Sequence, residues 1–160
     1  MSQNFFHDNK WMLIVLAIII FGIAWWLISP FWRIIRMDEP FPETSQVSPP
    51  VVERRSSEKS VLAEAPLVAS AHDVQGKVLL IQKGEQKILR FENLKTINGP
   101  DLRIYLSTDL KATDFVDLGA IKATEGNVNY VLPAGIDTEK YRNVLIWCRA
   151  FSVLFSSAKL

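Results

Sequence analysis

The chain has 160 residues and a formal net charge of +1, with 18 Lys and Arg against 17 Asp and Glu. This length has room for one domain with appendages, and the near-zero charge gives no reason to expect binding to nucleic acid through a basic surface. Composition then divides the chain into three parts. Residues 1–36 carry four of the five Trp, residues 37–66 carry five of the eight Pro and no Gly, and residues 67–160 carry six of the seven Gly and the single Cys. These shifts predict an anchor with its flanks, a linker and a folded domain, in that order.

Residues 11–28 form an uninterrupted run without a charge, WMLIVLAIIIFGIAWWLI. As a helix the run is about 27 Å long, close to the hydrocarbon thickness of a bilayer. Trp11 lies at one end and Trp25 and Trp26 lie at the other, where indole rings favour the membrane interface. A cleaved signal peptide fits less well, because no small-residue cleavage site follows. The sequence therefore predicts that residues 11–28 cross a lipid bilayer as the only transmembrane helix.

The flanks of this run say little about orientation. Lys10 precedes it, whereas Arg33 and Arg36 follow it. Counting Lys and Arg alone, the positive-inside rule favours a cytoplasmic C-terminus by a single residue. That margin does not decide on which side of the membrane the rest of the chain lies.

Residues 37–66 are rich in Pro, Ser and Glu and contain little that a core could bury. Such a composition is typical of segments that stay extended or disordered. A Pro-rich spacer extends by about 3 Å per residue, so this one could hold a domain tens of ångströms from the bilayer. The sequence predicts an inert, disordered linker here.

From Gln75 onward, short runs of alternating apolar and polar residues are separated by turn residues, which is typical of an antiparallel β-sandwich. A Lys-Gly-Glu turn at residues 83–85 predicts a hairpin between the first two runs. Strands are predicted at residues 77–82, 86–91, 102–107 and 128–132. The sequence therefore predicts an all-β fold, with about seven strands around one core, for residues 67–160.

The alternation changes parity near the end of the chain. Apolar residues take even positions from 144 to 148 and odd positions from 151 to 155. Arg149 and Ala150, between them, include no Gly, Asn or Asp, so a two-residue hairpin is not expected there. A β-bulge inside one long strand accounts for the change, and bulges often re-aim side chains beside functional sites. This interpretation makes Cys148, next to the predicted bulge, the first functional candidate.

Several multi-residue motifs follow one another in the β region. They are Leu89-Arg90-Phe91-Glu92-Asn93-Leu94, Asn98-Gly99-Pro100-Asp101-Leu102-Arg103-Ile104-Tyr105-Leu106-Ser107, Asp117-Leu118-Gly119, Gly126-Asn127-Val128-Asn129-Tyr130 and Ile146-Trp147-Cys148-Arg149-Ala150-Phe151. In this order they resemble the DM13 domain, over residues 72–160. Ser156 stands where that family commonly has Gly.

The resemblance implies a β-sandwich on the extracytoplasmic side of a cell membrane, with the N-terminus in the cytoplasm. It also implies electron transfer through a thiol or a thiol-ligated prosthetic group, and the matching cysteine is Cys148. Trp147 and Arg149 adjoin it and are supporting candidates. His72 is a further candidate as an orienting base, against the reading of a solvated loop histidine. Asp101, in the Gly-Pro-Asp turn, is a candidate whose simpler role is to cap its own turn.

Cys148 has two readings that the residues leave open. As an unpaired cysteine outside the cell it is either a free thiol or the partner of a second protein's cysteine. The apolar neighbours Ile146 and Trp147 favour a small buried core residue, whereas Arg149 favours a reactive thiolate. Redox chemistry therefore competes with a structural role.

Residue counts limit the cofactors. A blue-copper site needs two His and a Cys, usually with an axial Met, but the β region has His72 alone and no Met. Structural zinc fails on the same shortage unless several carboxylates contribute, and the C-x-x-C-H motif of covalent haem is absent. Non-covalent haem on the Cys148 thiolate stays open. No phosphate-binding Gly loop, G-x-S-x-G elbow or paired-carboxylate motif appears, so no hydrolase or nucleotide enzyme is expected.

Two functions follow from these observations. The first is a membrane-tethered, extracytoplasmic DM13-like module with electron transfer or thiol redox chemistry at Cys148, acting with a redox protein of the cell envelope. The second is a non-enzymatic binding or structural module of the envelope, in which Cys148 is a buried core residue.

Overall fold

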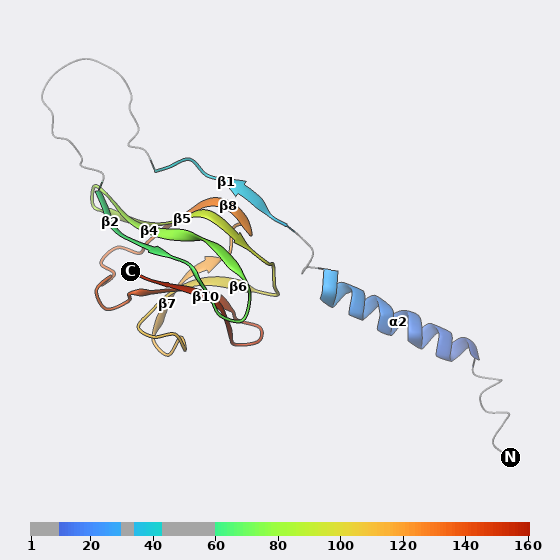
Figure 1. Ribbon diagram of the computed structural model, residues 1–160. Helices are drawn as coiled ribbons and strands as arrows, with labels where there is room; N and C mark the ends of the chain where they lie inside the picture. The colour runs from blue at the N-terminus through green and yellow to red at the C-terminus, as the bar shows by residue number, and fades with distance from the viewer. Residues whose placement is uncertain (1–9, 30–33, 43–59) are drawn as a thin grey trace, which may run out of the picture. The chain divides into compact units, whose positions relative to one another are not determined.

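One helix and ten strands make up most of the residues that the structure describes, which are 10–29, 34–42 and 60–160 of a computed structural model (Figure 1). The helix α2 (Lys10–Ile28) belongs to one unit, Met1–Arg33, and every strand belongs to the other, Ile34–Leu160. The uncharged run is thus helical, and its described side chains are almost all exposed. Within the described part of the chain, no helix combines the length and hydropathy that crossing a membrane requires.

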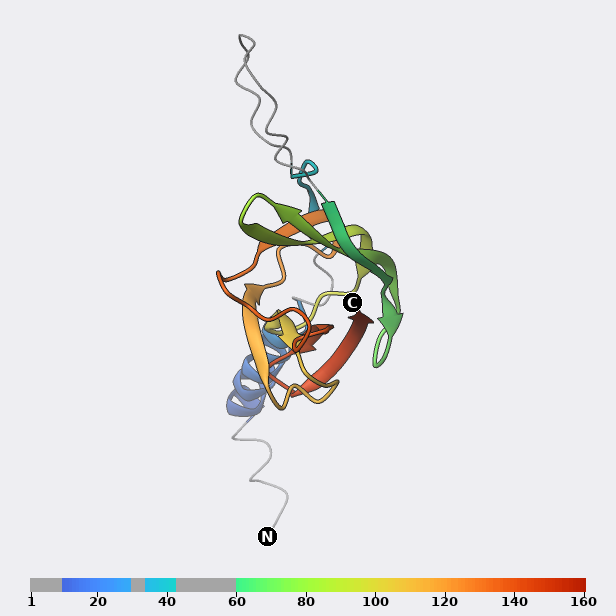
Figure 2. The same ribbon diagram turned by 90° about the vertical axis from the view of Figure 1, so that its left-hand side faces the viewer.

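The strands form two five-stranded sheets that lie on opposite sides of a shared interior (Figure 2). Sheet A has the order β1 (Arg36–Asp38), β8 (Glu125–Val131), β5 (Gln86–Thr96), β4 (Val74–Lys83) and β2 (Ser60–Pro66). Sheet B has the order β3 (Val68–Ala69), β10 (Val153–Lys159), β9 (Asn143–Cys148), β6 (Leu102–Ser107) and β7 (Phe115–Ala120). All neighbours are antiparallel except β1 and β8, which run parallel. The predicted all-β sandwich is confirmed, with this one parallel pair added.

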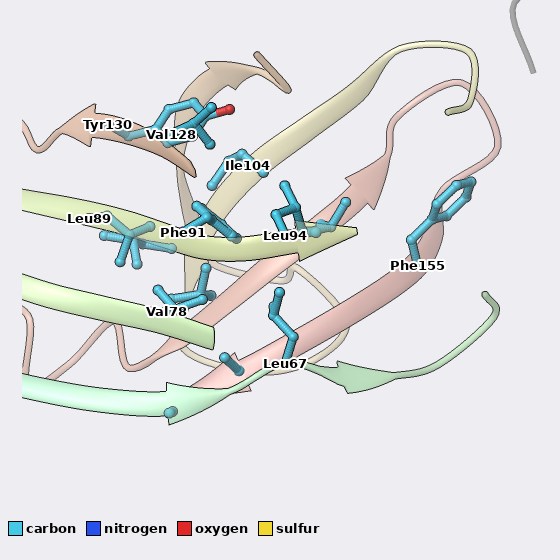
Figure 3. Close-up of a cluster of buried hydrophobic side chains, with 14 of the residues drawn as sticks. Leu67, Val78, Leu89, Phe91, Leu94, Ile104, Val128, Tyr130 and Phe155 are labelled. Atoms are coloured by element: carbon cyan, nitrogen blue, oxygen red, sulfur yellow. The ribbon is translucent and has the colours of Figure 1, made fainter. Parts of the chain in front are cut away.

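Alternate residues of each sheet meet in one apolar core (Figure 3). Phe91 and Leu89 of β5, Ile104 of β6 and Val128 of β8 are fully buried in it. Tyr130 closes one side, with its ring 5.8 Å from that of Phe91 in an edge-to-face arrangement. Its hydroxyl accepts a hydrogen bond from the backbone nitrogen of Lys122 at 2.8 Å, and burial raises the pKa of Tyr130 to about 12. The predicted core is therefore present between the sheets and contains a neutral, hydrogen-bonded tyrosine. A second, smaller apolar cluster of Leu79, Ile81 and Ile88 belongs to sheet A.

Both ends of the segment predicted to be a disordered linker form strands instead. Residues 36–38 pair with β8, and residues 60–66 pair with β4. β2 is an edge strand in which only Ala65 is buried, so its residues lack the strong hydrophobic alternation that predicts a strand. Backbone pairing to neighbouring strands stabilises both segments. The rest of the predicted linker, residues 43–59, lies outside the described residues.

The predicted long, bulged strand near the C-terminus is wrong. β9 ends at Cys148, β10 begins at Val153, and the two strands pair antiparallel across the turn at residues 149–152. Ser152 has a φ of 53°, so a serine takes the left-handed conformation that usually signals Gly or Asn. An irregularity in the register does occur, but between Leu154 and Ser156 of β10. The change of parity thus reflects a hairpin turn followed by a shift in register.

Candidate redox site at Cys148

Cys148 is the last residue of β9, a strand with β6 on one side and β10 on the other. It pairs with Leu102 of β6 and with Val153 of β10. Its side chain is fully buried in the main core, and its Sγ donates a hydrogen bond to the carbonyl oxygen of Pro100 at 3.1 Å. The thiol therefore lies at the end of a central strand. There the core meets two turns, one at Pro100 and Asp101 and the other at residues 149–152.

These two turns are joined by contacts between Asp101 and Arg149. The backbone nitrogen of Arg149 donates to the carbonyl oxygen of Asp101 at 3.1 Å, and Arg149 Nε donates to Asp101 Oδ2 at 2.6 Å. Asp101 has a φ of 57°, which turns the chain after Pro100. We expected Asp101 to cap its own turn, but its carboxylate binds Arg149 across the gap between the turns. The pair lies beside Cys148 and closes the end of β9.

His72 was a candidate orienting base for the Cys148 thiol, but its described contacts are with Phe155. Its imidazole lies on the ring of Phe155, with centroids 4.2 Å apart, and its backbone nitrogen donates to the Phe155 carbonyl oxygen at 3.4 Å. Phe155 follows the turn at residues 149–152 and belongs to the main core. His72 therefore packs against β10 rather than serving as the hydrogen-bond partner of Cys148, whose described partner is Pro100.

Trp147 points to the opposite face of sheet B from Cys148, because successive residues of a strand alternate. There its ring stacks on that of Tyr105, with centroids 6.3 Å apart, and Tyr105 stacks on Phe115 at 4.2 Å. We call Trp147, Tyr105 and Phe115 the aromatic row. Tyr105 is only 2% exposed, and its burial raises its pKa. Sequence reasoning missed Tyr105 and Phe115, because only the register of β6, β7 and β9 brings them beside Trp147.

The surroundings of Cys148 do not fit a bound prosthetic group in this conformation. The thiol is fully buried and its Sγ already contacts the Pro100 carbonyl oxygen, which leaves no room for a haem on that sulfur. A cavity of about 350 Å³ lies elsewhere, between residues 85–87 and 132–136. In the described residues, no three His, Cys, Asp or Glu side chains gather in a group suited to a metal ion. Cys148 is thus a buried thiol whose described side-chain partner is a backbone carbonyl oxygen.

A scan against protein-family models matches residues 66–160 to the family described as "Electron transfer DM13". The chain belongs to the DM13 family. The match covers more than half of the sequence and includes β3 to β10. The resemblance read from the motifs is therefore confirmed. Searches of curated proteins and of solved structures gave no significant match.

Proposed function

We propose that this DM13 protein is a membrane-tethered electron-transfer module in which the Cys148 thiol exchanges electrons with thiols and disulfides of other envelope proteins. The family description supports electron transfer. Cys148 supports the location, because it is the only thiol of the chain and lies where the core meets two exposed turns. The position of this single thiol is the observation that carries the proposal.

The proposed chemistry is thiol–disulfide exchange. The Cys148 sulfur, as a thiolate, attacks a disulfide of an acceptor protein, so that a mixed disulfide forms and one acceptor sulfur leaves as a thiolate. A donor dithiol then attacks the Cys148 sulfur, which releases the second acceptor thiolate. The donor's second thiol closes the donor disulfide and restores Cys148. Two electrons pass from donor to acceptor, and each departing thiolate takes up a proton that an attacking thiol lost.

Exchange requires local opening, because Cys148 is fully buried. The contacts that hold the end of β9 closed are the hydrogen bond to Pro100 and the pairing of Asp101 with Arg149. Both charged side chains are partly exposed, at 34% and 56%, so their pairing is weak enough to break and reform. Separation of the two turns is therefore the opening step of the proposal.

Asp101→Asn tests this opening in the folded protein. We expect the variant to raise the rate at which a small disulfide reagent modifies Cys148 by about two- to fivefold, because it weakens an exposed ion pair. Mass spectrometry of the modified protein gives the rate, with Cys148→Ser as the unreactive control. Asp114→Asn, which removes a surface ion pair with Lys140, is the matched control and should leave the rate unchanged. Equal rates for Asp101→Asn and the parent, with modification only on global unfolding, would contradict the proposal.

The membrane tether is a proposal that rests on the uncharged run at residues 11–28 and its Trp flanks. We expect alkaline carbonate to leave the full chain in the membrane fraction, and Ile19→Arg to release it. In right-side-out vesicles, added protease should cut the chain between residues 43 and 59, which we infer to lie outside. Fragments must be read on a denaturing gel. Extraction of the parent chain by carbonate, or complete protection from protease, would contradict the tether or its orientation.

The burial of Cys148 also favours a second function. Free cysteines are often inert core residues, and this one packs among apolar side chains. The module would then act by binding, and the aromatic row offers an apolar surface, since Phe115 is 41% exposed. The two functions separate in Cys148→Ser, which abolishes thiol exchange but leaves a folded binding module active.

A further inference from the structure

The segment at residues 34–42, which we call the clasp, lies along the outer edge of sheet A (Figure 1). Its strand β1 pairs parallel with β8, from Arg36 opposite Glu125 to Asp38 opposite Asn127. The clasp lies outside the residues that match the family, and residues 43–59 connect it to β2. It is therefore a separate piece of chain added to the edge of the domain.

Hydrogen bonds hold the clasp against the β8 edge between Thr124 and Asn129. Thr124 and Ile35 exchange hydrogen bonds, through the Thr124 nitrogen to the Ile35 oxygen at 2.8 Å and the Ile35 nitrogen to Thr124 Oγ1 at 2.9 Å. Further along, the nitrogen of Glu39 donates to the carbonyl oxygen of Asn127 at 2.8 Å. Such pairing is how an extended peptide adds a strand to an open sheet edge.

Gly126 of β8 makes room for this backbone. It has a φ of 113°, and a Cβ added there would overlap the carbonyl oxygen of Met37. Gly is the one residue that combines this backbone conformation with the absence of a side chain. The β8 edge is thus shaped to let the clasp backbone approach closely.

Side chains then recognise the particular residues of the clasp. Arg90 Nη1 donates to the carbonyl oxygens of Glu39 and Pro40, at 3.1 and 3.2 Å, and its guanidinium lies 5.0 Å from the ring of Phe41. The Glu39 carboxylate accepts bonds from Lys122 Nζ at 3.0 Å and from the backbone nitrogen of Asn129 at 2.7 Å. Partial burial raises the pKa of Glu39, but these bonds outweigh it and hold the pKa below its usual value. Phe41 also packs on the second apolar cluster of sheet A, made of Leu79, Ile81 and Ile88.

We propose that the β8 edge is a peptide-binding groove whose ligand is the chain's own clasp, an extended segment that contains Glu39, Pro40 and Phe41. In this groove, Gly126 lets the clasp backbone approach closely, and Lys122 and Asn129 bind the Glu39 carboxylate. The Arg90 guanidinium lies against the ring of Phe41. The consequence is that the domain stays attached to the N-terminal part of the chain after residues 43–59 are cut. Proteolysis of the connection therefore does not shed the domain.

The test uses the full chain in detergent, with a sequence-specific protease site placed within residues 43–59 and an affinity tag at the N-terminus. After cleavage, we expect the C-terminal piece to stay on the affinity resin through extended washing. Excess synthetic peptide of residues 34–42 should release it, and the same peptide carrying Glu39→Ala and Phe41→Ala should not. Immediate release of the parent's C-terminal piece on cleavage would overturn the proposal.

Variants in the chain separate recognition from folding. Glu39→Ala with Phe41→Ala alters the ligand alone, and we expect the cut domain to leave the resin at least tenfold faster than the parent. Gly126→Ala alters the groove and should have the same effect. Glu64→Gln removes an ion pair with Lys77 at the opposite edge of sheet A and should leave retention unchanged. If the ligand variant is retained as long as the parent, the groove does not recognise these residues and the proposal fails.

Discussion

A fragment of residues 67–160 is expected not to fold, although it contains nearly all of the family match, whereas the fragment Ile34–Leu160 is expected to fold cooperatively. The shorter fragment lacks β2, which pairs with β4 at six positions from Ser60 opposite Gln82 to Pro66 opposite Lys77. Without β2, the apolar strand β4 becomes an open edge, and such edges promote aggregation. The fragment also lacks the clasp, which leaves the cluster of Leu79, Ile81 and Ile88 without Phe41.

Circular dichroism, amide proton dispersion and size-exclusion chromatography of the two fragments measure this difference. We expect a single folded species with one thermal transition for Ile34–Leu160 and aggregated or unfolded chain for the shorter fragment. A fragment of residues 60–160, which restores β2 alone, should be intermediate. Equal melting temperatures for the longest and shortest fragments would show that neither edge segment matters for the fold.

Arg90→Met is expected to destabilise the fragment Ile34–Leu160 by about 3 kcal/mol, because it removes a buried charge from its partners. Arg90 is 5% exposed, and its guanidinium donates to Glu92 Oε1 at 2.9 Å and to Asn129 Oδ1 at 3.0 Å, besides the two clasp carbonyls. Methionine keeps much of the aliphatic volume but leaves all four acceptors without this donor. Acceptors left unsatisfied in a part-buried site cost more than the net value of their bonds.

Urea unfolding measures this loss as a lower midpoint with an unchanged slope. Lys77→Met is the matched control, since Lys77 also pairs with Glu92 but is far more exposed. We expect that control to stay close to the parent. If Arg90→Met unfolds at the parent's midpoint, the guanidinium does not hold sheet A and the clasp together as described.

The core of the fold could be predicted because it follows alternation and turn chemistry. β4 and β5 were expected from apolar runs on either side of a turn with Gly84, and β6 from the alternation of residues 102–107. The edge segments could not be predicted in the same way. β1 has three exposed residues, and its place depends on Gly126 and Arg90, far along the chain.

In the candidate site, too, some features could be predicted from the sequence and others could not. Cys148 was singled out from its place beside a change of alternation, although the cause is a hairpin turn containing Ser152 at positive φ rather than a bulge. The partnership of Asp101 with Arg149 depends on two turns that meet only in the folded sheet. The aromatic row likewise depends on the register between three strands. The strands could be predicted from local alternation along the sequence. The contacts of the site could not, because they depend on the register between strands that lie far apart in the sequence.

Electron transfer through Cys148 is tested most directly by trapping its redox partners in the membrane. Membranes that carry the full chain are quenched with acid, their free thiols are alkylated, and the proteins are separated without reductant. If Cys148 exchanges electrons with partners, we expect a species of higher mass that contains this chain, disappears on reduction and is absent from Cys148→Ser, whose fold is checked by thermal unfolding. A chain found only as a free thiol, blocked from alkylation until denaturant is added, would contradict this exchange and leave Cys148 a structural residue of a binding module.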